Sequence, residues 1–235
     1  MATSFKRCVI SAMFIRYARA AAARGARVTV TSSRQERVAH AVEVIGAGAK
    51  GEVADLASEA AIEALFGRCG AIDHLVYTAG EELLLGPVAE LDVGAAKRAF
   101  DVRVFGALTA VKHAARRIRP NGSVVLTHGI AGQRPRAGWS VGASICGAME
   151  SMTRALAVEL SPIRVNAVSP GFVRTPLWRG IPEADREAMF RDVGSSLLTK
   201  RVGEPEQIAE AYLYLMENEF TSGQTLVVDG GGSLV

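Results

Sequence analysis

The chain has 235 residues, of which 49% are hydrophobic and 22% are charged, and its formal net charge is +3. This length suits one large core, and the composition excludes a disordered chain. The 24 glycines follow no repeat period, which excludes a fibrous or solenoid protein. No apolar run reaches the roughly 18 residues of a membrane span, and no basic cluster is interleaved with aromatic residues. We therefore expect no membrane partner and no nucleic-acid partner.

The three cysteines, Cys8, Cys69 and Cys146, lie far apart and form no Cys-x-x-Cys pair. An odd, unpatterned set of cysteines is typical of reduced thiols, so we expect a cytoplasmic protein. The four histidines show no spacing of metal ligands, and we expect no metal site.

Seven short runs rich in Val and Ile predict strands, at residues 7–11, 27–31, 51–54, 72–77, 123–127, 163–168 and 225–228. Helical patterns alternate with these runs, at residues 13–24, 34–45, 58–68, 93–118, 143–160 and 205–216. The runs are apolar on both faces, as buried parallel strands are. This alternation predicts an α/β fold: one Rossmann-like domain over residues 1–235, with a doubly wound parallel sheet and helices on both faces. The irregular region at about 171–203, with a short helix at 183–193, is predicted to be a lid or binding loop.

One stretch near the C-terminus carries a specific motif. Residues 164–171 read Arg-Val-Asn-Ala-Val-Ser-Pro-Gly, and Thr175 follows four residues later. Asp55 follows the third predicted strand, and Ala79-Gly80 follows the fourth. With these motifs, the chain resembles the short-chain dehydrogenase/reductase family from about residue 25 onwards. The resemblance implies a doubly wound fold and hydride transfer that depends on a nicotinamide cofactor.

The segment between the first strand and the first helix departs from that family. The family has Thr-Gly-x-x-x-Gly-x-Gly there, so that backbone amides approach the pyrophosphate at a helix N-terminus. Residues 8–16 instead read Cys-Val-Ile-Ser-Ala-Met-Phe-Ile-Arg, and no glycine precedes Gly25. We therefore expect no cofactor, and interpret the family's remaining cofactor-side positions as vestiges, namely Asp55, Ala79, Gly80, Pro170, Gly171 and Thr175.

The family's catalytic positions are also altered. Aligning Gly147-Ala148 with the small residues that follow the family's lysine places Gly142 at the tyrosine and Cys146 at the lysine. The family's serine then falls on Gly129 and its asparagine on Arg103. If neighbouring side chains do not move inward, the cleft becomes larger and more apolar, which suits a bulky hydrophobic ligand.

Three polar residues near these positions are candidate catalytic residues. Arg103 could bind a carboxylate or stabilise an oxyanion, or form a structural salt bridge. His128 could act as a general base, or complete the hydrogen bonds of a strand end. Cys146 could become a nucleophile if Arg103 lowers the pKa of its thiol, or fill the core.

These residues leave three hypotheses open. The favoured one is a cofactor-independent lyase, isomerase, dehydratase or cyclase that acts on a small hydrophobic carbonyl compound. The second is a non-catalytic binding or partner subunit. The third is an atypical NADP(H)-dependent oxidoreductase in which Ser32, Ser33 and Arg34 meet a 2′-phosphate. For the assembly we expect a homo-oligomer, a dimer or tetramer, or a hetero-oligomer with an active relative.

Overall fold

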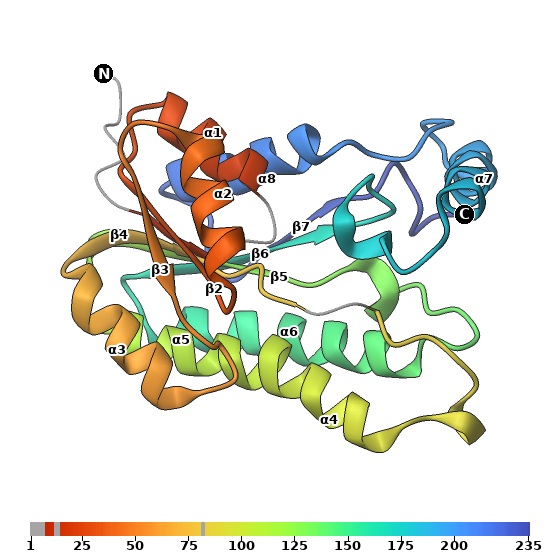
Figure 1. Ribbon diagram of the computed structural model, residues 1–235, viewed down its shortest axis with the longest axis horizontal. Coiled ribbons are helices and arrows are strands. Elements are labelled where there is room, and N and C mark those ends of the chain that lie inside the picture. Colours follow the sequence, from red (N-terminus) through yellow and green to blue (C-terminus); the bar gives the residue numbers. More distant parts are fainter. Residues whose placement is uncertain (1–7, 12–14, 81–82) are drawn as a thin grey trace.

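A seven-stranded parallel sheet forms the centre of the molecule in the computed structural model, which describes residues 8–11, 15–80 and 83–235 (Figure 1). The strand order is β3-β2-β1-β4-β5-β6-β7, and every neighbouring pair is parallel. The strands are β1 (Cys8–Ser11), β2 (Val28–Ser32), β3 (Ala49–Val53), β4 (Ile72–Val76), β5 (Ile118–Thr127), β6 (Arg164–Pro170) and β7 (Thr225–Val228). All seven predicted strands are confirmed, and so is the predicted fold class.

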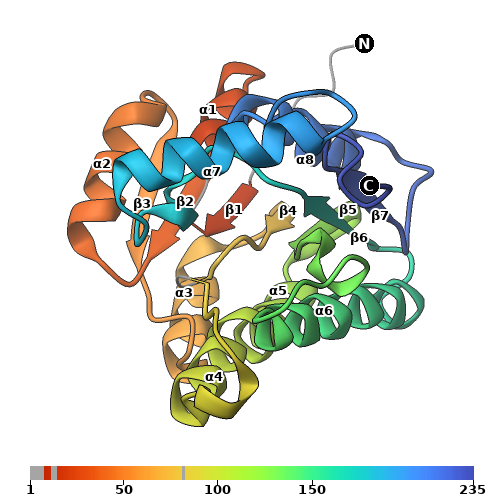
Figure 2. The same ribbon diagram turned by 90° about the vertical axis from the view of Figure 1, so that its right-hand side faces the viewer.

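Helices cover both faces of the sheet (Figures 1 and 2). One face carries α1 (Ile15–Ala23), α2 (Gln35–Ile45) and α8 (Pro205–Glu217). The other carries α3 (Glu59–Cys69), α4 (Val93–Phe100), α5 (Gly106–Ala115) and α6 (Ser140–Glu159). Each face buries its own apolar cluster against the sheet. The remaining helix, α7 (Glu183–Ser196), lies in the predicted lid region, and none of the described helices is long and apolar enough to cross a membrane.

Local signals in the sequence explain several helix ends. The Ser58 hydroxyl accepts a hydrogen bond from the backbone N–H of Ala61 (3.4 Å), which caps the start of α3. At the end of α2, Gly46 adopts a φ of 83°, a left-handed conformation that glycine enters without steric cost. The structure extends the predicted helix at 143–160 back to Ser140 and the one at 183–193 on to Ser196.

The predicted helix at 93–118 is confirmed from Val93 to Ala115, but it is not regular and it ends earlier than predicted. A π-helical turn, η2 (Asp101–Phe105), lies between α4 and α5, and β5 already begins at Ile118. The Tyr77 hydroxyl donates a hydrogen bond to the carbonyl oxygen of Val102 (2.6 Å), inside this wider turn. A side chain at Gly106 would collide with the backbone of Leu56 and with the Tyr77 hydroxyl, so the chain packs closely here. Single π turns of this kind often occur at functional sites.

Two residues of the 164–171 motif have a structural role. The buried Arg164 guanidinium donates hydrogen bonds to the carbonyl oxygens of Leu215 (2.7 Å) and Met216 (2.8 Å), in the last turn of α8. These carbonyls have no partner within the helix, and a cation also suits the negative end of the helix dipole. The Asn166 amide donates to the carbonyl oxygen of Thr221 (2.7 Å). The motif therefore fastens β6 to the end of α8 and to the segment that precedes β7.

Candidate active site

A cavity of about 130 Å³ opens where β4, β5 and β6 end. In a doubly wound sheet, ligands bind at this carboxyl edge. Its walls come from the segments after these strands, from α4 and η2, from α6 and from the lid: Thr78, Ala79, Leu83, Leu84, Ala99, Arg103, residues 127–131, Trp139, Val141, Gly142, Ile145, Cys146, residues 170–173, Thr175, Leu177 and Trp178. Most of these residues are apolar, and Arg103 brings a charged side chain to the wall.

All three candidate catalytic residues, Arg103, His128 and Cys146, line this cavity. The guanidinium of Arg103 lies directly against Gly80. A Cβ atom built on Gly80 would come 2.5 Å from Cζ of Arg103, so a residue larger than glycine at position 80 would displace the guanidinium. The π turn η2 and the glycine together fix where the charge reaches the cavity.

His128 has both ring nitrogens within reach of neighbouring groups. Nδ1 lies 3.2 Å from the carbonyl oxygen of Gly129, and Nε2 lies 3.3 Å from the hydroxyl of Thr225. A neutral ring satisfies both contacts if Nδ1–H donates to Gly129 and Nε2 accepts from Thr225. Burial lowers the pKa of His128, which favours the neutral ring. The contacts resemble those of a strand-end residue that completes local hydrogen bonds.

Cys146 does not have the lowered pKa that a nucleophile needs. Burial raises the pKa of its thiol, and this effect outweighs the opposing effects of backbone hydrogen bonds from Gly129, Gly132 and Ala131 and of the Arg103 charge. Arg103 lowers the pKa of this thiol, as expected, but burial raises it by more, because the thiolate loses its contact with water. The other alternative, that Cys146 fills the core, fits this balance better, and a catalytic role for Cys146 stays a prediction.

Gly129 and Gly142 leave open space in the cavity wall. A Cβ atom on Gly142 would meet no atom within 4 Å. On Gly129 it would lie 3.6 Å from the carbonyl oxygen of Pro170 and 3.7 Å from Sγ of Cys146, which is ordinary contact. Neighbouring side chains have therefore not moved into this space. The prediction of an enlarged, apolar cleft depended on this condition.

Four of the six cofactor-side positions, Ala79, Pro170, Gly171 and Thr175, line the same cavity. The other two have local roles near it. Gly80 accommodates Arg103, and the Asp55 carboxylate accepts a hydrogen bond from the backbone N–H of Ala57 (2.9 Å).

The lid region carries an aromatic cluster that closes one end of the cavity. Its buried aromatic members are Phe172, Trp178 and Phe190. The buried Val202 packs with them, and so does Trp139 from the segment before α6. Trp139, Leu83 and Leu84 were missed from the sequence, because only the fold brings these separate segments to one cavity. Among the residues that the structure describes, no group of three or more His, Cys, Asp or Glu side chains could hold a metal ion.

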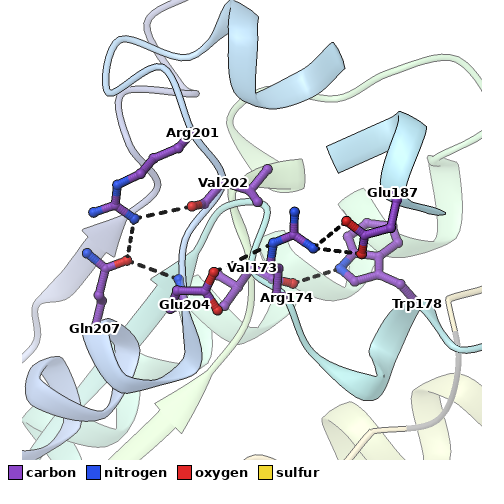
Figure 3. Close-up of polar contacts among 8 residues, drawn as sticks. All are labelled: Val173, Arg174, Trp178, Glu187, Arg201, Val202, Glu204 and Gln207. Atoms are coloured by element: carbon purple, nitrogen blue, oxygen red, sulfur yellow. Dashed lines mark hydrogen bonds and ion pairs between the residues drawn. The ribbon is translucent and has the colours of Figure 1, made fainter. Parts of the chain in front are cut away.

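A polar network holds the lid from outside (Figure 3). The guanidinium of Arg174 donates two hydrogen bonds, both 2.7 Å, to the carboxylate oxygens of Glu187 on α7. Its Nε lies 3.6 Å from the carboxylate of Glu204 at the start of α8. The indole N–H of Trp178 donates to the carbonyl oxygen of Val173 (3.0 Å), so the network and the aromatic cluster share this segment.

Comparisons with known proteins identify the family. Residues 15–233 match the family model described as enoyl-(acyl carrier protein) reductase. The chain is 36% identical over 233 residues to the short-chain dehydrogenase/reductase ucsE of Acremonium sp, across 91% of this chain and 88% of that protein. It is 34% identical over 232 residues to cis-4-hydroxycyclohexanecarboxylate dehydrogenase of Sinomonas cyclohexanicum, across 93% of this chain and 91% of that protein.

Two solved structures are similar over almost the whole chain. A small-chain dehydrogenase in complex with NADPH superposes with a TM-score of 0.83 and 32% identity, covering 98% of this chain and all of that chain (100%). The MalC reductase/Diels-Alderase of Malbranchea aurantiaca superposes with a TM-score of 0.92 and 26% identity, covering 100% of this chain and 98% of that chain.

These findings contradict two expectations from the sequence, a cofactor-independent enzyme and the absence of a cofactor. The relatives are named dehydrogenases and reductases, and one similar structure contains NADPH, which points to an oxidoreductase with a nicotinamide cofactor. The physical reason lies in how the carboxyl edge is built: backbone segments such as Pro170-Gly171 line it, and they persist when individual side chains change. The match over residues 15–233, together with relatives that are more than 30% identical over nine-tenths of the chain, shows that this protein belongs to the short-chain dehydrogenase/reductase family.

Proposed function

We propose that the protein is an NADP(H)-dependent oxidoreductase that interconverts a bulky, hydrophobic carbonyl compound and its alcohol. One observation carries the proposal: a single apolar cavity is lined both by the cofactor-side residues Pro170, Gly171 and Thr175 and by the cation of Arg103. The names of the relatives and the NADPH of the similar dehydrogenase support the same reaction class.

The nicotinamide end of the cavity fits a flat ring that backbone groups hold. A Cβ atom on Gly171 would come 2.7 Å from the Cα of Asp229, so the backbone packs closely here and forms a firm rim. The Asp229 carboxylate accepts hydrogen bonds from the backbone N–H groups of Gly231 (2.8 Å) and Ser233 (2.7 Å), which fixes the rim from behind. We assign the nicotinamide to this rim, where its chemistry is to give or take a hydride.

The phosphate end is assigned to the end of β2. Ser33 and Arg34 are exposed there, immediately after Ser32. A guanidinium pairs well with a phosphate, so this segment favours NADPH over NADH. The glycine-poor turn between β1 and α1, including Met13, lies outside the described residues.

At the reacting end, Arg103 takes the place of a tyrosine as the group next to the substrate oxygen. Its guanidinium donates hydrogen bonds to a carbonyl oxygen and stabilises the negative charge that forms on it during reduction. A charge interaction of this kind is stronger in an apolar cavity than in water. The Arg103 guanidinium donates hydrogen bonds to the oxygen but no proton, so the proton that completes the alcohol comes from water.

The catalytic wall of this site is altered, with Gly129, Gly142 and Cys146 where the resemblance implies serine, tyrosine and lysine. Since a Cβ on Gly142 would meet no atom within 4 Å, the substrate occupies this space. His128 and Cys146 form part of the wall in this proposal, and neither moves a proton.

The test is NADPH-dependent turnover across a series of ketones of increasing size. We expect bulky ketones to be reduced faster than small ones, and the substitution Gly142→Leu to lower kcat/KM for the bulky ketones by roughly 10-fold or more. Val158→Ala, at an exposed position on α6, is the control and should leave both rates unchanged. Failure of purified protein to oxidise NADPH with any ketone or aldehyde would overturn the proposal.

A further inference from the structure

One wall of the cavity consists of aromatic rings, and the roles proposed for Arg103 and the cofactor rim do not involve these rings. The rings of Phe172 and Trp178 are stacked, with centroids 5.1 Å apart and planes 9° apart. The Trp139 ring is tilted by 54° to Phe172 and by 50° to Trp178, at 6.0 and 6.4 Å. The three rings meet as two sides of a corner, and all three residues line the cavity.

Contacts with neighbouring residues fix this corner. The Trp178 indole donates to the Val173 carbonyl oxygen (3.0 Å), and the Phe190 ring meets it edge-on at 89°. The Arg136 guanidinium lies 5.1 Å from the centre of the Phe172 ring. Such contacts hold the rings in place before a ligand arrives, which lowers the entropic cost of binding.

The surroundings of the corner are aliphatic. Leu83, Leu84 and Ile145 line the same cavity. The volume of about 130 Å³ is close to that of apolar cavities that hold benzene, at about 150 Å³. One six-membered ring therefore fits between the aromatic corner and the aliphatic residues.

We propose that the substrate is a ketone or aldehyde on a flat aromatic or conjugated ring system, which packs against Trp139 and Trp178. Aromatic rings gain from stacked and edge-to-face contacts beyond the burial of their area, whereas a saturated ring of the same carbon count does not. This inference rests on the proposed function for the carbonyl beside Arg103, but the ring contact itself needs no turnover.

The chain offers a direct reporter, because Trp139 and Trp178 are its two tryptophans and both line the cavity. The experiment titrates two matched ketones that each carry one six-membered ring, acetophenone and acetylcyclohexane. Binding is measured by calorimetry with and without NADPH, and tryptophan fluorescence places the ligand. We expect acetophenone to bind at least about 5-fold more tightly, and Trp139→Leu and Trp178→Leu each to reduce that preference roughly 2- to 10-fold.

Leu177→Ala is the matched control, because Leu177 lines the cavity without an aromatic ring. This substitution should weaken the binding of both ketones alike and leave the ratio of their affinities unchanged. Circular dichroism checks that each variant folds. Equal affinities for the two ketones, a preference that survives both tryptophan substitutions, or no binding of either ketone would overturn the inference. Loss of NADPH turnover with the ring preference intact would instead count against the proposed function alone.

Discussion

The cavity wall from β6 and the loop that follows it differs from the wall formed by the end of β5 and the start of α6. At Gly171 a Cβ atom would collide with Asp229, so the first wall is held by close backbone packing. At Gly142 a Cβ atom would meet nothing within 4 Å, so the second wall is open. A wall built from backbone keeps its shape when side chains change, whereas a wall built from side chains loses its chemistry and gains room. Substitutions on the two walls and at nearby groups should reveal this difference, most strongly at Arg103 and least at Glu187.

The largest effect is expected at Arg103, which supplies the charge that the open wall lacks. Arg103→Gln should lower kcat for the ketone reduction by about 100- to 1,000-fold, as the loss of an oxyanion-stabilising donor does. Arg103→Lys keeps the charge but loses the planar fork of the guanidinium. Its kcat should lie between those of the unaltered protein and Arg103→Gln. Steady-state kinetics of NADPH oxidation measure both. An unchanged kcat in Arg103→Gln would contradict the role given to this residue.

The next largest effect is expected in the pH dependence of stability, to which two histidines contribute: His74 inside the sheet and His128 on the cavity wall. Burial lowers the pKa of His74 to about 4, below the value of about 6.5 in an unfolded chain. Between these values the unfolded state binds more protons, so the free energy of unfolding should fall by up to about 3 kcal/mol as pH drops from 6.5 to 4. Burial also lowers the pKa of His128, which acts in the same direction.

Chemical denaturation across this pH range measures the effect. His74→Asn keeps a polar partner for the Ser123 hydroxyl, which lies 2.8 Å from Nδ1 of His74, but cannot titrate. Its unfolding free energy should depend less steeply on pH than that of the unaltered protein. Identical slopes in the two proteins would contradict the assignment to His74.

A matched pair of alanine substitutions tests the two walls directly. Gly171→Ala forces a Cβ atom against Asp229 and should cost about 1–3 kcal/mol of stability. Gly142→Ala lies in the first turn of α6 with open space around its Cβ, and should stabilise the fold by about 0.5–1 kcal/mol. Thermal unfolding of both variants shows whether each substitution raises or lowers the stability. Two changes of the same sign would mean that the walls do not differ as described.

The smallest effect is expected in the polar network outside the lid. Arg174 holds the pKa of the Glu187 carboxyl below its usual range. The stability that this pair adds is present at neutral pH and is lost as pH falls through that lowered pKa. Glu187→Gln should therefore lower the melting temperature slightly at pH 7 and not at all in strong acid. A difference that grows towards acid pH would contradict this assignment.

Much of the fold could be predicted from the sequence because strand and helix signals are local. Short runs rich in Val and Ile, which alternate with helical patterns, mark most of the strands, and Ser58 and Gly46 mark helix ends. The π turn at Asp101–Phe105 could not be predicted, because it accompanies the contact of Tyr77 with Val102, which only the folded chain creates.

The site was predictable in position but less so in chemistry. Spacing from the family motif brought Arg103, His128 and Cys146 to one cavity, as the structure has them. The raised pKa of Cys146 could not be predicted, because the burial that outweighs the Arg103 charge is a property of the fold. The prediction that no cofactor binds was wrong. Changed side chains are visible in the sequence, whereas the rim of backbone groups is visible only in the structure.

The cofactor assignment depends above all on the rim at Pro170-Gly171 and Thr175, which should bind a nicotinamide. Calorimetric titration of purified protein with NADPH and NADH measures this binding. We expect saturable binding of NADPH that is at least about 10-fold tighter than binding of NADH, and loss of this preference in Arg34→Ala. Absence of binding of either cofactor at millimolar concentration would contradict the assignment.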